Sequence, residues 1–151
     1  MSSLTIDVLR ENINALGESV KALKNVYDKC MLIGIKEAYS DEELIYLEAL
    51  TARYARTTDL LIHKTLRSLD AAEYMTLGSV IDSANRAEKR GIVDSADQLR
   101  TLKDLRNEIS HEYIGSKCAE LFRQVISLVP LLSSIIDRTI IYASKYLKKG
   151  I

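Results

Sequence analysis

The feature that most constrains the fold is a three-and-four-residue spacing of apolar side chains, sustained over long stretches of the chain. Near the N-terminus its members are Ile6, Leu9, Ile13, Leu16, Val20, Leu23 and Tyr27. This spacing places apolar side chains on one face of an α-helix, and that face must be buried against other helices. The alternation typical of strands is absent, and the 151 residues include only six glycines and one proline. The sequence therefore predicts an all-α fold.

Capping residues predict where the first two helices begin and end. The first is expected to begin near Ser3 or Thr5 and to end close to residue 33, just before a glycine. The second is expected to begin after Ser40, because Glu43 follows three residues later and completes a capping box. Its apolar spacing continues as far as Leu69.

Three further helices follow from the same signals. Residues 70–75 are predicted to form a linker, and Thr76 to cap a short helix over residues 77–90. Ser95 is predicted to cap the next helix, and the last helix is expected over residues 116–149, with a kink or break at Pro130. We therefore expect one domain over residues 1–151, an antiparallel bundle of four long helices plus a short helix.

Composition narrows the class of protein. Lys and Arg together number 21, as do Asp and Glu, so the chain lacks the global basic field of a protein that coats duplex nucleic acid. The two cysteines, Cys30 and Cys118, are too few and too isolated for a disulfide framework. We see no signal peptide, and polar residues interrupt the most apolar stretch, residues 125–141. A cytoplasmic protein without a membrane segment is expected.

The helix after Ser95 carries a cation where its pattern calls for an apolar side chain. Leu99, Leu102, Leu105 and Ile109 form its buried stripe, and Arg106 falls inside that stripe. A guanidinium in this place must meet an anion, because an unpaired buried charge is costly. The simplest interpretation is an ion pair with a carboxylate across the bundle.

A catalytic interpretation stands beside the structural one. Arg106 offers a planar fork of donors to phosphate oxygens, and an ordinary histidine side chain titrates near neutrality, so the pair of Arg106 and His111 suits metal-independent phosphoryl chemistry. Glu108 and His111 also form one E-x-x-H pair, but a di-iron bundle needs a second pair, and His63 provides none. We therefore expect neither a metal nor another cofactor.

The second helix carries a row of charged residues at intervals of three: Arg53, Arg56 and Asp59. One interpretation is a solvent-exposed pair between Arg56 and Asp59, which contributes only a few tenths of a kcal/mol. The other is a second wall of the Arg106 site, with arginines that bind substrate and an aspartate that orients Arg106 or His111.

These residues carry a family resemblance. The run from Arg106 to Tyr113 resembles the RN-x3-H-x-Y signature of the HEPN superfamily, in its toxin branch. Members are small helical bundles commonly paired with a minimal nucleotidyltransferase antitoxin. The row Arg53-x-x-Arg56-x-x-Asp59 and the segment at residues 85–91 are similar to the same branch, so the likeness covers about residues 40–115.

The resemblance implies a dimeric, metal-independent endoribonuclease that leaves a cyclic phosphate on the 5′ product. By position, Arg106 would grip the scissile phosphate, His111 would act as acid and base, and Asn107 would help to position the site. Tyr113 would receive AMP from the nucleotidyltransferase, which would silence the toxin. The alternatives are a non-catalytic bundle that only binds, or is modified by, a nucleotidyltransferase, and a structural bundle with no site.

Overall fold

A computed structural model describes residues 2–76, 78–111 and 117–148, with the side chains of 110, 111, 117 and 118 left outside the description. Its helices are α1 (Ser3–Ile33), α2 (Asp41–Asp59), η1 (Leu60–Thr65), α3 (Leu66–Ala72), α4 (Val80–Lys89), α5 (Ala96–His111) and α6 (Lys117–Leu147). Within these ranges no strand occurs. The predicted all-α fold and its bundle character are confirmed.

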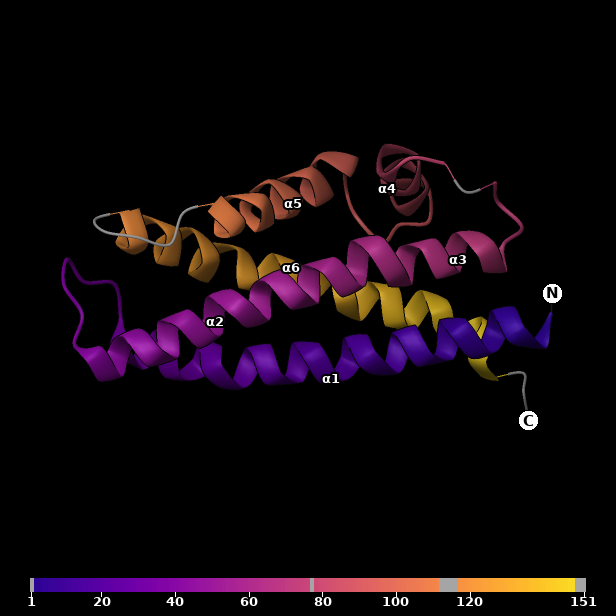
Figure 1. The fold of residues 1–151 in the computed structure, drawn as a ribbon. Helices are drawn as coiled ribbons and strands as arrows, with labels where there is room; N and C mark the ends of the chain where they lie inside the picture. The colour runs from indigo at the N-terminus through magenta and orange to yellow at the C-terminus, as the bar shows by residue number, and fades with distance from the viewer. Residues whose placement is uncertain (1, 77, 112–116, 149–151) are drawn as a thin grey trace.

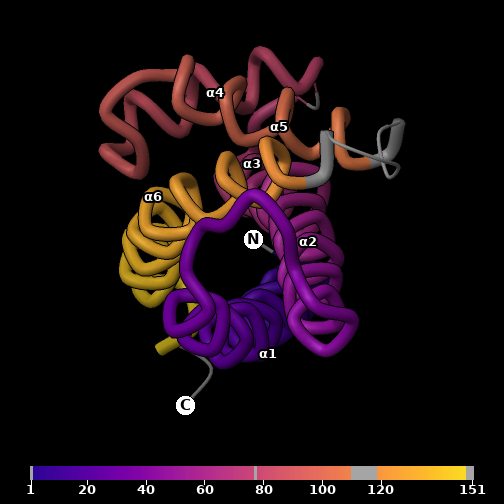
Figure 2. The backbone as a smooth tube through the Cα atoms, turned by 90° about the vertical axis from the view of Figure 1, so that its left-hand side faces the viewer, coloured from indigo at the N-terminus to yellow at the C-terminus, as the bar shows by residue number. Residues whose placement is uncertain are grey.

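The longest helices lie side by side along the molecule (Figure 1). α1 packs against α2 and α6, and α2 also contacts α6, so these three helices enclose a common core. Figure 2 shows α4 and α5 on one side of the three. α5 contacts both α2 and α6, whereas α4 is seen nearly end-on in Figure 1 and contacts α3, η1 and α5. The helix that carries the sequence motif is therefore supported by two of the three core helices.

The apolar stripe predicted for the first helix forms one wall of the core. Leu9, Leu16 and Leu23 are fully buried in α1, and Leu47 of α2 and Leu132 of α6 belong to the same buried cluster. Burying a side chain of this size stabilises the fold by about 1.5–3 kcal/mol relative to leaving it exposed. This core fixes the relative positions of the helices on which the candidate site is built.

The predicted ends of the first two helices are nearly correct. The cap of α1 is Ser2 rather than Ser3 or Thr5, because the Ser2 hydroxyl accepts a hydrogen bond from the Thr5 amide at 3.2 Å. The capping box of α2 is confirmed: the Glu43 amide donates to the Ser40 hydroxyl at 3.2 Å, and the Ser40 amide donates to the Glu43 carboxylate at 2.9 Å.

The prediction for the short helix was wrong at its start. α4 begins at Val80 and is capped by Ser79, whose hydroxyl accepts from the Asp82 amide at 3.2 Å, while the Asp82 carboxylate accepts from the Ser79 amide at 2.8 Å. A helix starting at residue 77 would also place Gly78 in its first turn, where glycine is unfavourable. Ile81, in the first turn of α4, is 65% exposed.

The capping difference gives a direct stability test. We expect Ser79→Ala to lower the free energy of unfolding by about 1 kcal/mol, because the Asp82 amide loses its acceptor. Thr76→Ala, at the position that the sequence favoured as the cap, is the matched control and should change stability by less than about 0.5 kcal/mol. Urea denaturation of the two variants measures both. Equal effects would show that Ser79 is not the effective cap.

The second long helical stretch is not uniformly α-helical. Between α2 and α3 the backbone forms a π turn, η1, in which hydrogen bonds close over five residues, as from the Leu66 amide to the Leu61 carbonyl. The predicted linker at residues 70–75 is also wrong in its first part, because α3 continues to Ala72. Asp70, expected in that linker, is fully buried.

Asp70 is buried because it joins a network of charges between α3 and α4. Its carboxylate lies 3.1 Å from Arg86 Nη1 and 2.8 Å from Arg90 Nη2. Arg90 also reaches Glu73, with Nε 2.8 Å from a carboxylate oxygen. Two acids and two arginines therefore tie the end of α3 to α4. A buried carboxylate is tolerated here because cations reach both of its oxygens.

The network extends to α6 through Glu73. Its carboxylate accepts hydrogen bonds from the phenols of Tyr142, at 2.6 Å, and Tyr146. Burial by itself would raise the pKa of Glu73, but the hydrogen bonds from Tyr142, Tyr146 and Arg90 outweigh burial and hold the pKa below its ordinary value. Glu73 is therefore ionised at neutral pH and links three helices.

The lowered pKa of Glu73 predicts how stability depends on pH. Because the folded-state pKa lies below the ordinary value of about 4.3, the stabilisation holds above that pH and is lost as the pH falls towards the folded-state pKa. We expect Glu73→Gln to cost about 2 kcal/mol near neutral pH. The difference from the wild type should shrink below about pH 4.

Urea midpoints measured across this pH range test the prediction. Glu120→Gln is the control, because Glu120 makes exposed contacts on its own helix, a pair with Arg123 at 3.5 Å and a hydrogen bond from Gln124 at 3.4 Å. A difference between Glu73→Gln and the wild type that stays constant with pH would contradict the assignment.

A kink or a break was predicted at Pro130. The last helix runs through Pro130 without a break.

α6 is long and apolar enough, by length and composition alone, to cross a membrane. Its most apolar window, within residues 119–147, has a mean hydropathy of 1.6 and is 39% buried. A core helix meets the same criterion, and α6 packs against α1, α2 and α5, so this one helix is weak evidence for a membrane span.

Candidate active site

The predicted apolar stripe of α5 is buried as expected. Leu99, Leu102, Leu105 and Ile109 are each less than 5% exposed and belong to the core. The buried phenol of Tyr54 on α2 donates to the Leu102 carbonyl at 2.9 Å. This hydrogen bond from α2 to the backbone of α5 was not anticipated from the sequence, because nothing in the pattern distinguishes Tyr54 from the other core tyrosines. It fixes α5 against α2 about one turn before Arg106.

Arg106 pairs with Asp59. Its Nε donates to both oxygens of the Asp59 carboxylate, at 3.0 and 2.9 Å. The two residues are 47 positions apart in the sequence, and their side chains are 26% and 39% exposed. Arg106 lies within the apolar stripe and therefore needs an anionic partner, which Asp59 provides. The Arg106 side chain is still partly exposed to solvent. The ion pair joins the two sequence segments that carried the family resemblance.

The two arginines of the charged row on α2 make different contacts from Asp59. Arg53 donates a hydrogen bond to the Ala22 carbonyl of α1 at 2.8 Å, so this arginine stabilises the packing of α2 against α1. Arg56 is exposed and lies three residues before Asp59, on the same part of α2. The structure thus brings Asp59 to Arg106, leaves Arg56 within one turn of that pair, and directs Arg53 to another helix.

Two further motif residues, Asn107 and His111, belong to the last part of α5. Asn107 is exposed. His111 is the last residue of α5, and its side chain lies outside the described residues. Tyr113 lies outside them altogether. Because α5 stays helical to its end, positions 106 and 111 are separated by about 140° around the helix axis. Within one chain, the two positions therefore belong to different faces of α5.

A π turn begins directly after Asp59. η1 spans Leu60–Thr65 and follows α2 without interruption. Single π turns within α-helices occur frequently at functional sites, because the extra residue redirects the side chains around it. Exposed His63 lies in this turn. The sequence gives no signal for the turn, since its apolar residues fit an ordinary α-helix as well.

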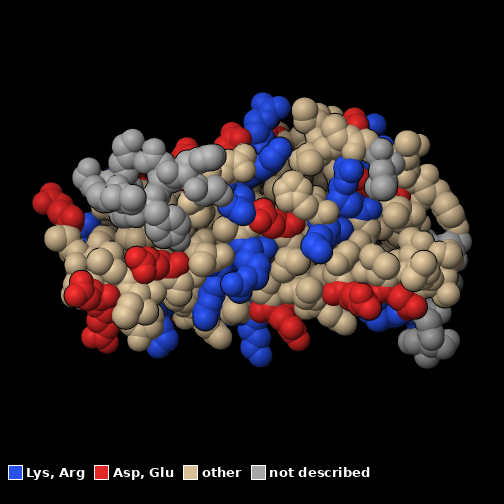
Figure 3. Space-filling view, viewed as in Figure 1, with Lys and Arg blue, Asp and Glu red and all other residues tan. Residues whose placement is uncertain are grey.

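Positive charge gathers on one face of the molecule (Figure 3) despite the zero net charge of the chain. Figure 3 shows Lys and Arg side chains grouped at the middle of the face on which α2 and α5 lie, with acidic side chains mostly around them. A local group of cations suits binding of a phosphate backbone at one place, without the long basic surface of a duplex-binding protein.

Within the part of the chain that the structure describes, no group of three or more His, Cys, Asp or Glu side chains is arranged to hold a metal ion. The chemistry available around Asp59 and Arg106 is that of a guanidinium, a carboxylate and neighbouring polar groups. Comparison of the chain with protein-family models, curated proteins and solved structures finds no match.

Proposed function

We propose that the chain is a toxin-type, metal-independent endoribonuclease with a HEPN-like arrangement of four long helices and a short helix. The observation that supports this proposal is the ion pair between Asp59 and Arg106. It joins the charged row of α2 to Arg106, the first residue of the RN-x3-H-x-Y segment, and the resemblance links these two stretches. The proposed setting is the cytoplasm, and the proposed substrate is single-stranded RNA, including the ends of tRNA.

In the proposed reaction, the ribose 2′-oxygen attacks the adjacent phosphorus. The new O–P bond forms as the bond from phosphorus to the 5′-oxygen breaks, which leaves a 2′,3′-cyclic phosphate and a 5′-hydroxyl. His111 removes the proton from the 2′-hydroxyl or supplies one to the leaving oxygen. Arg106, oriented by Asp59, stabilises the charge that develops on the phosphate oxygens. No metal is needed for either role.

A homodimer reconciles this chemistry with the geometry of α5. Positions 106 and 111 lie about 140° apart around one helix, so one chain alone does not direct both residues at the same phosphate. An isologous interface brings two copies of α5 together, and His111 of one protomer can then act beside Arg106 of its partner.

We further propose that a cognate nucleotidyltransferase silences the toxin by adding AMP to Tyr113. A bulky, charged group two residues from His111 would block the binding of RNA.

Cleavage of a labelled RNA pool in EDTA tests the proposal. We expect wild-type protein to cut RNA without metal and to leave cyclic-phosphate ends. His111→Ala should reduce the rate by about 10²–10⁴-fold, the usual contribution of a general acid–base residue. His63→Ala is the matched control, because His63 is the other histidine of the chain and is exposed on η1. No cutting by folded, dimeric wild type that carries no AMP would instead favour a non-catalytic binding partner of a nucleotidyltransferase.

A further inference from the structure

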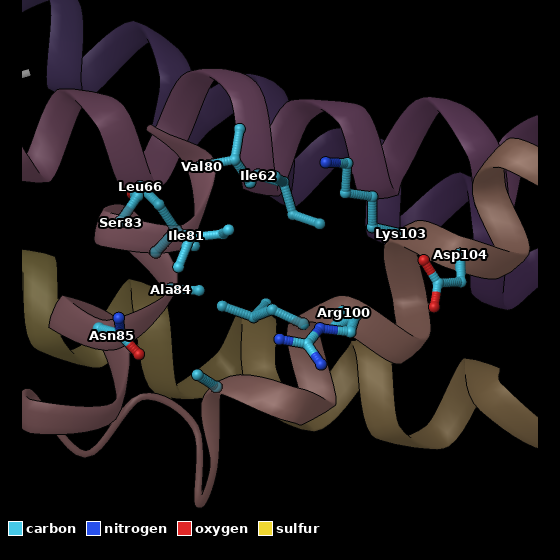
Figure 4. A pocket seen from close by; sticks show the side chains of 12 residues that line it. Ile62, Leu66, Val80, Ile81, Ser83, Ala84, Asn85, Arg100, Lys103 and Asp104 are labelled. Carbon is cyan, nitrogen blue, oxygen red and sulfur yellow. The ribbon is translucent and has the colours of Figure 1, made fainter. Parts of the chain in front are cut away.

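A cavity of about 270 Å³ lies between α4, α5 and η1 (Figure 4). Its apolar wall includes Ile62, Leu66, Val80, Ala84 and Leu99. Ligand pockets usually occupy about 300–1,000 Å³, so this cavity has room for one ring system and not for a larger molecule. Its position next to α5 places it on the element that carries Arg106.

One polar group inside this wall has no partner. Ser83 lines the cavity and is 1% exposed, and its hydroxyl has no hydrogen-bond partner among the described residues. Buried hydroxyls are nearly always hydrogen-bonded, because an unsatisfied one costs about 1–3 kcal/mol. An apolar cavity with one unsatisfied donor and acceptor fits a ligand that is flat and apolar on its faces and polar at its edge.

The opposite side of the cavity is charged and is lined by Arg100, Lys103 and Asp104 (Figure 4). Arg100 and Lys103 extend from α5 towards the apolar wall in Figure 4. The Arg100 side chain is 68% exposed, and it makes a long ion pair, 3.5 Å, with Asp97 on its own helix. Arg100, Lys103 and Arg106 follow one another at intervals of three residues, which form a continuous ridge on an α-helix. A row of cations thus leads from the cavity to the Asp59–Arg106 pair.

We propose that this cavity binds one base of the RNA, next to the phosphate that is held at Arg106. The inference rests on the proposed ribonuclease function and adds a subsite to it. The base enters between the apolar residues of α4 and η1, its polar edge meets the Ser83 hydroxyl, and the Arg100 guanidinium stacks on its exposed face. Lys103, midway between Arg100 and Arg106, binds the intervening phosphate.

Alternative occupants fit these observations less well. An apolar side chain from a protein partner would fill the cavity but would leave the Ser83 hydroxyl unsatisfied and would make no use of Arg100 and Lys103 at its edge. A free anion would pair with Arg100 and Lys103 but would not occupy the apolar wall. A nucleotide satisfies the wall, the hydroxyl and the cations together.

Binding of an uncleavable RNA tests the subsite separately from catalysis. The probe is a short, fluorescein-labelled oligoribonucleotide with every 2′-hydroxyl methylated, which cannot supply the attacking oxygen, and its affinity is measured by fluorescence anisotropy. We expect Ala84→Leu, which fills the cavity, to weaken binding about tenfold. Lys103→Gln should weaken binding and reduce the slope of log affinity against log salt by about 0.7, the value for one single-strand phosphate contact. Ala84→Leu should leave that slope unchanged.

Two further variants keep the test independent of folding defects. Ser83→Ala and Arg100→Gln are expected to weaken binding several-fold without filling the cavity. Arg123→Gln is the matched control for Arg100→Gln, because Arg123 makes the same exposed pair at 3.5 Å with the residue three positions before it. A set of probes is prepared, each with an abasic nucleotide at a different position. At one position the missing base should lower the affinity of the wild type but should not lower the already weakened affinity of Ala84→Leu any further.

The outcomes separate the subsite from the proposed function. Wild type that cuts RNA, with cavity variants that bind the probe as the wild type does, would overturn the subsite alone. A cavity variant that loses dimer formation or nucleotidyltransferase binding, but not RNA binding, would assign the cavity to a protein contact and also overturn the subsite. Wild type that neither cuts RNA nor binds the probe would overturn both proposals.

Discussion

Replacing Arg106 by glutamine is expected to slow RNA cleavage by about 10²–10³-fold while the protein stays folded. Glutamine can still donate a hydrogen bond to Asp59, but it has no charge to set against the charge that develops on the phosphate. The cost to stability should be below about 1 kcal/mol, because the Asp59 carboxylate is 39% exposed and remains solvated without its partner. A large loss of rate with little loss of stability distinguishes a catalytic arginine from a structural one.

Single-turnover cleavage rates and urea denaturation of the same preparations measure the two quantities. Arg138→Gln is the control, because Arg138 forms a partly exposed pair with Asp94, 2.9 Å long and 44 residues away in the sequence. It should leave both quantities unchanged. If Arg106→Gln cut RNA at the wild-type rate, or if it unfolded, the ion pair with Asp59 would be structural and the proposed role of Arg106 would be wrong.

Replacing Arg90 by methionine is expected to have the largest effect on stability, about 3–5 kcal/mol. The Arg90 side chain is 5% exposed and contacts both Asp70 and Glu73, so its removal leaves two acidic groups short of a cation in a buried place. Methionine keeps much of the apolar volume, and the loss therefore reports the charge rather than the packing. For a chain of this size the change corresponds to a fall in Tm of roughly 10 °C.

Thermal and urea denaturation test this expectation. Arg10→Met is the matched control, because Arg10 pairs with Asp7 at 3.1 Å on the surface of α1 and should contribute less than about 1 kcal/mol. Arg90→Met within about 1 kcal/mol of the wild type would contradict a stabilising role for the network. In that case Asp70 would have to draw its compensation from Arg86, which lies 3.1 Å away.

Apolar periodicity predicted the long helices and the buried face of α5. Leu99, Leu102 and Leu105 are buried because a three-and-four spacing admits only one helical face. The same argument required an anion for Arg106, and the structure provides Asp59. The sequence alone could not choose between Asp59 and another carboxylate, because that choice depends on how α2 and α5 pack.

Buried charges were the main source of error. Asp70 and Glu73 follow the last clear apolar repeat, so residues 70–75 resembled a linker. They are instead the acidic half of a network whose arginines, Arg86 and Arg90, lie on α4 and at its C-terminal cap and whose tyrosines lie on α6. Such a network is formed by tertiary packing, and a pattern read along one segment contains no information about its partners. The burial of the Ser83 hydroxyl without a hydrogen-bond partner also follows from tertiary packing, so it could not be predicted from the sequence.

The π turn makes one part of this helical stretch tolerant of a change in length. A π turn holds one residue more than an α-helical turn, and because the wider turn absorbs that residue, the helix after it keeps its orientation. Deleting one residue between Leu60 and Thr65 should therefore convert the turn to regular α-helix and leave Asp70 facing α4. The same deletion within α2 or α3 would rotate the residues on one side of it by about 100° relative to the other side. Chains that share this architecture should therefore tolerate single-residue deletions at the turn far better than within the α-helices on either side of it.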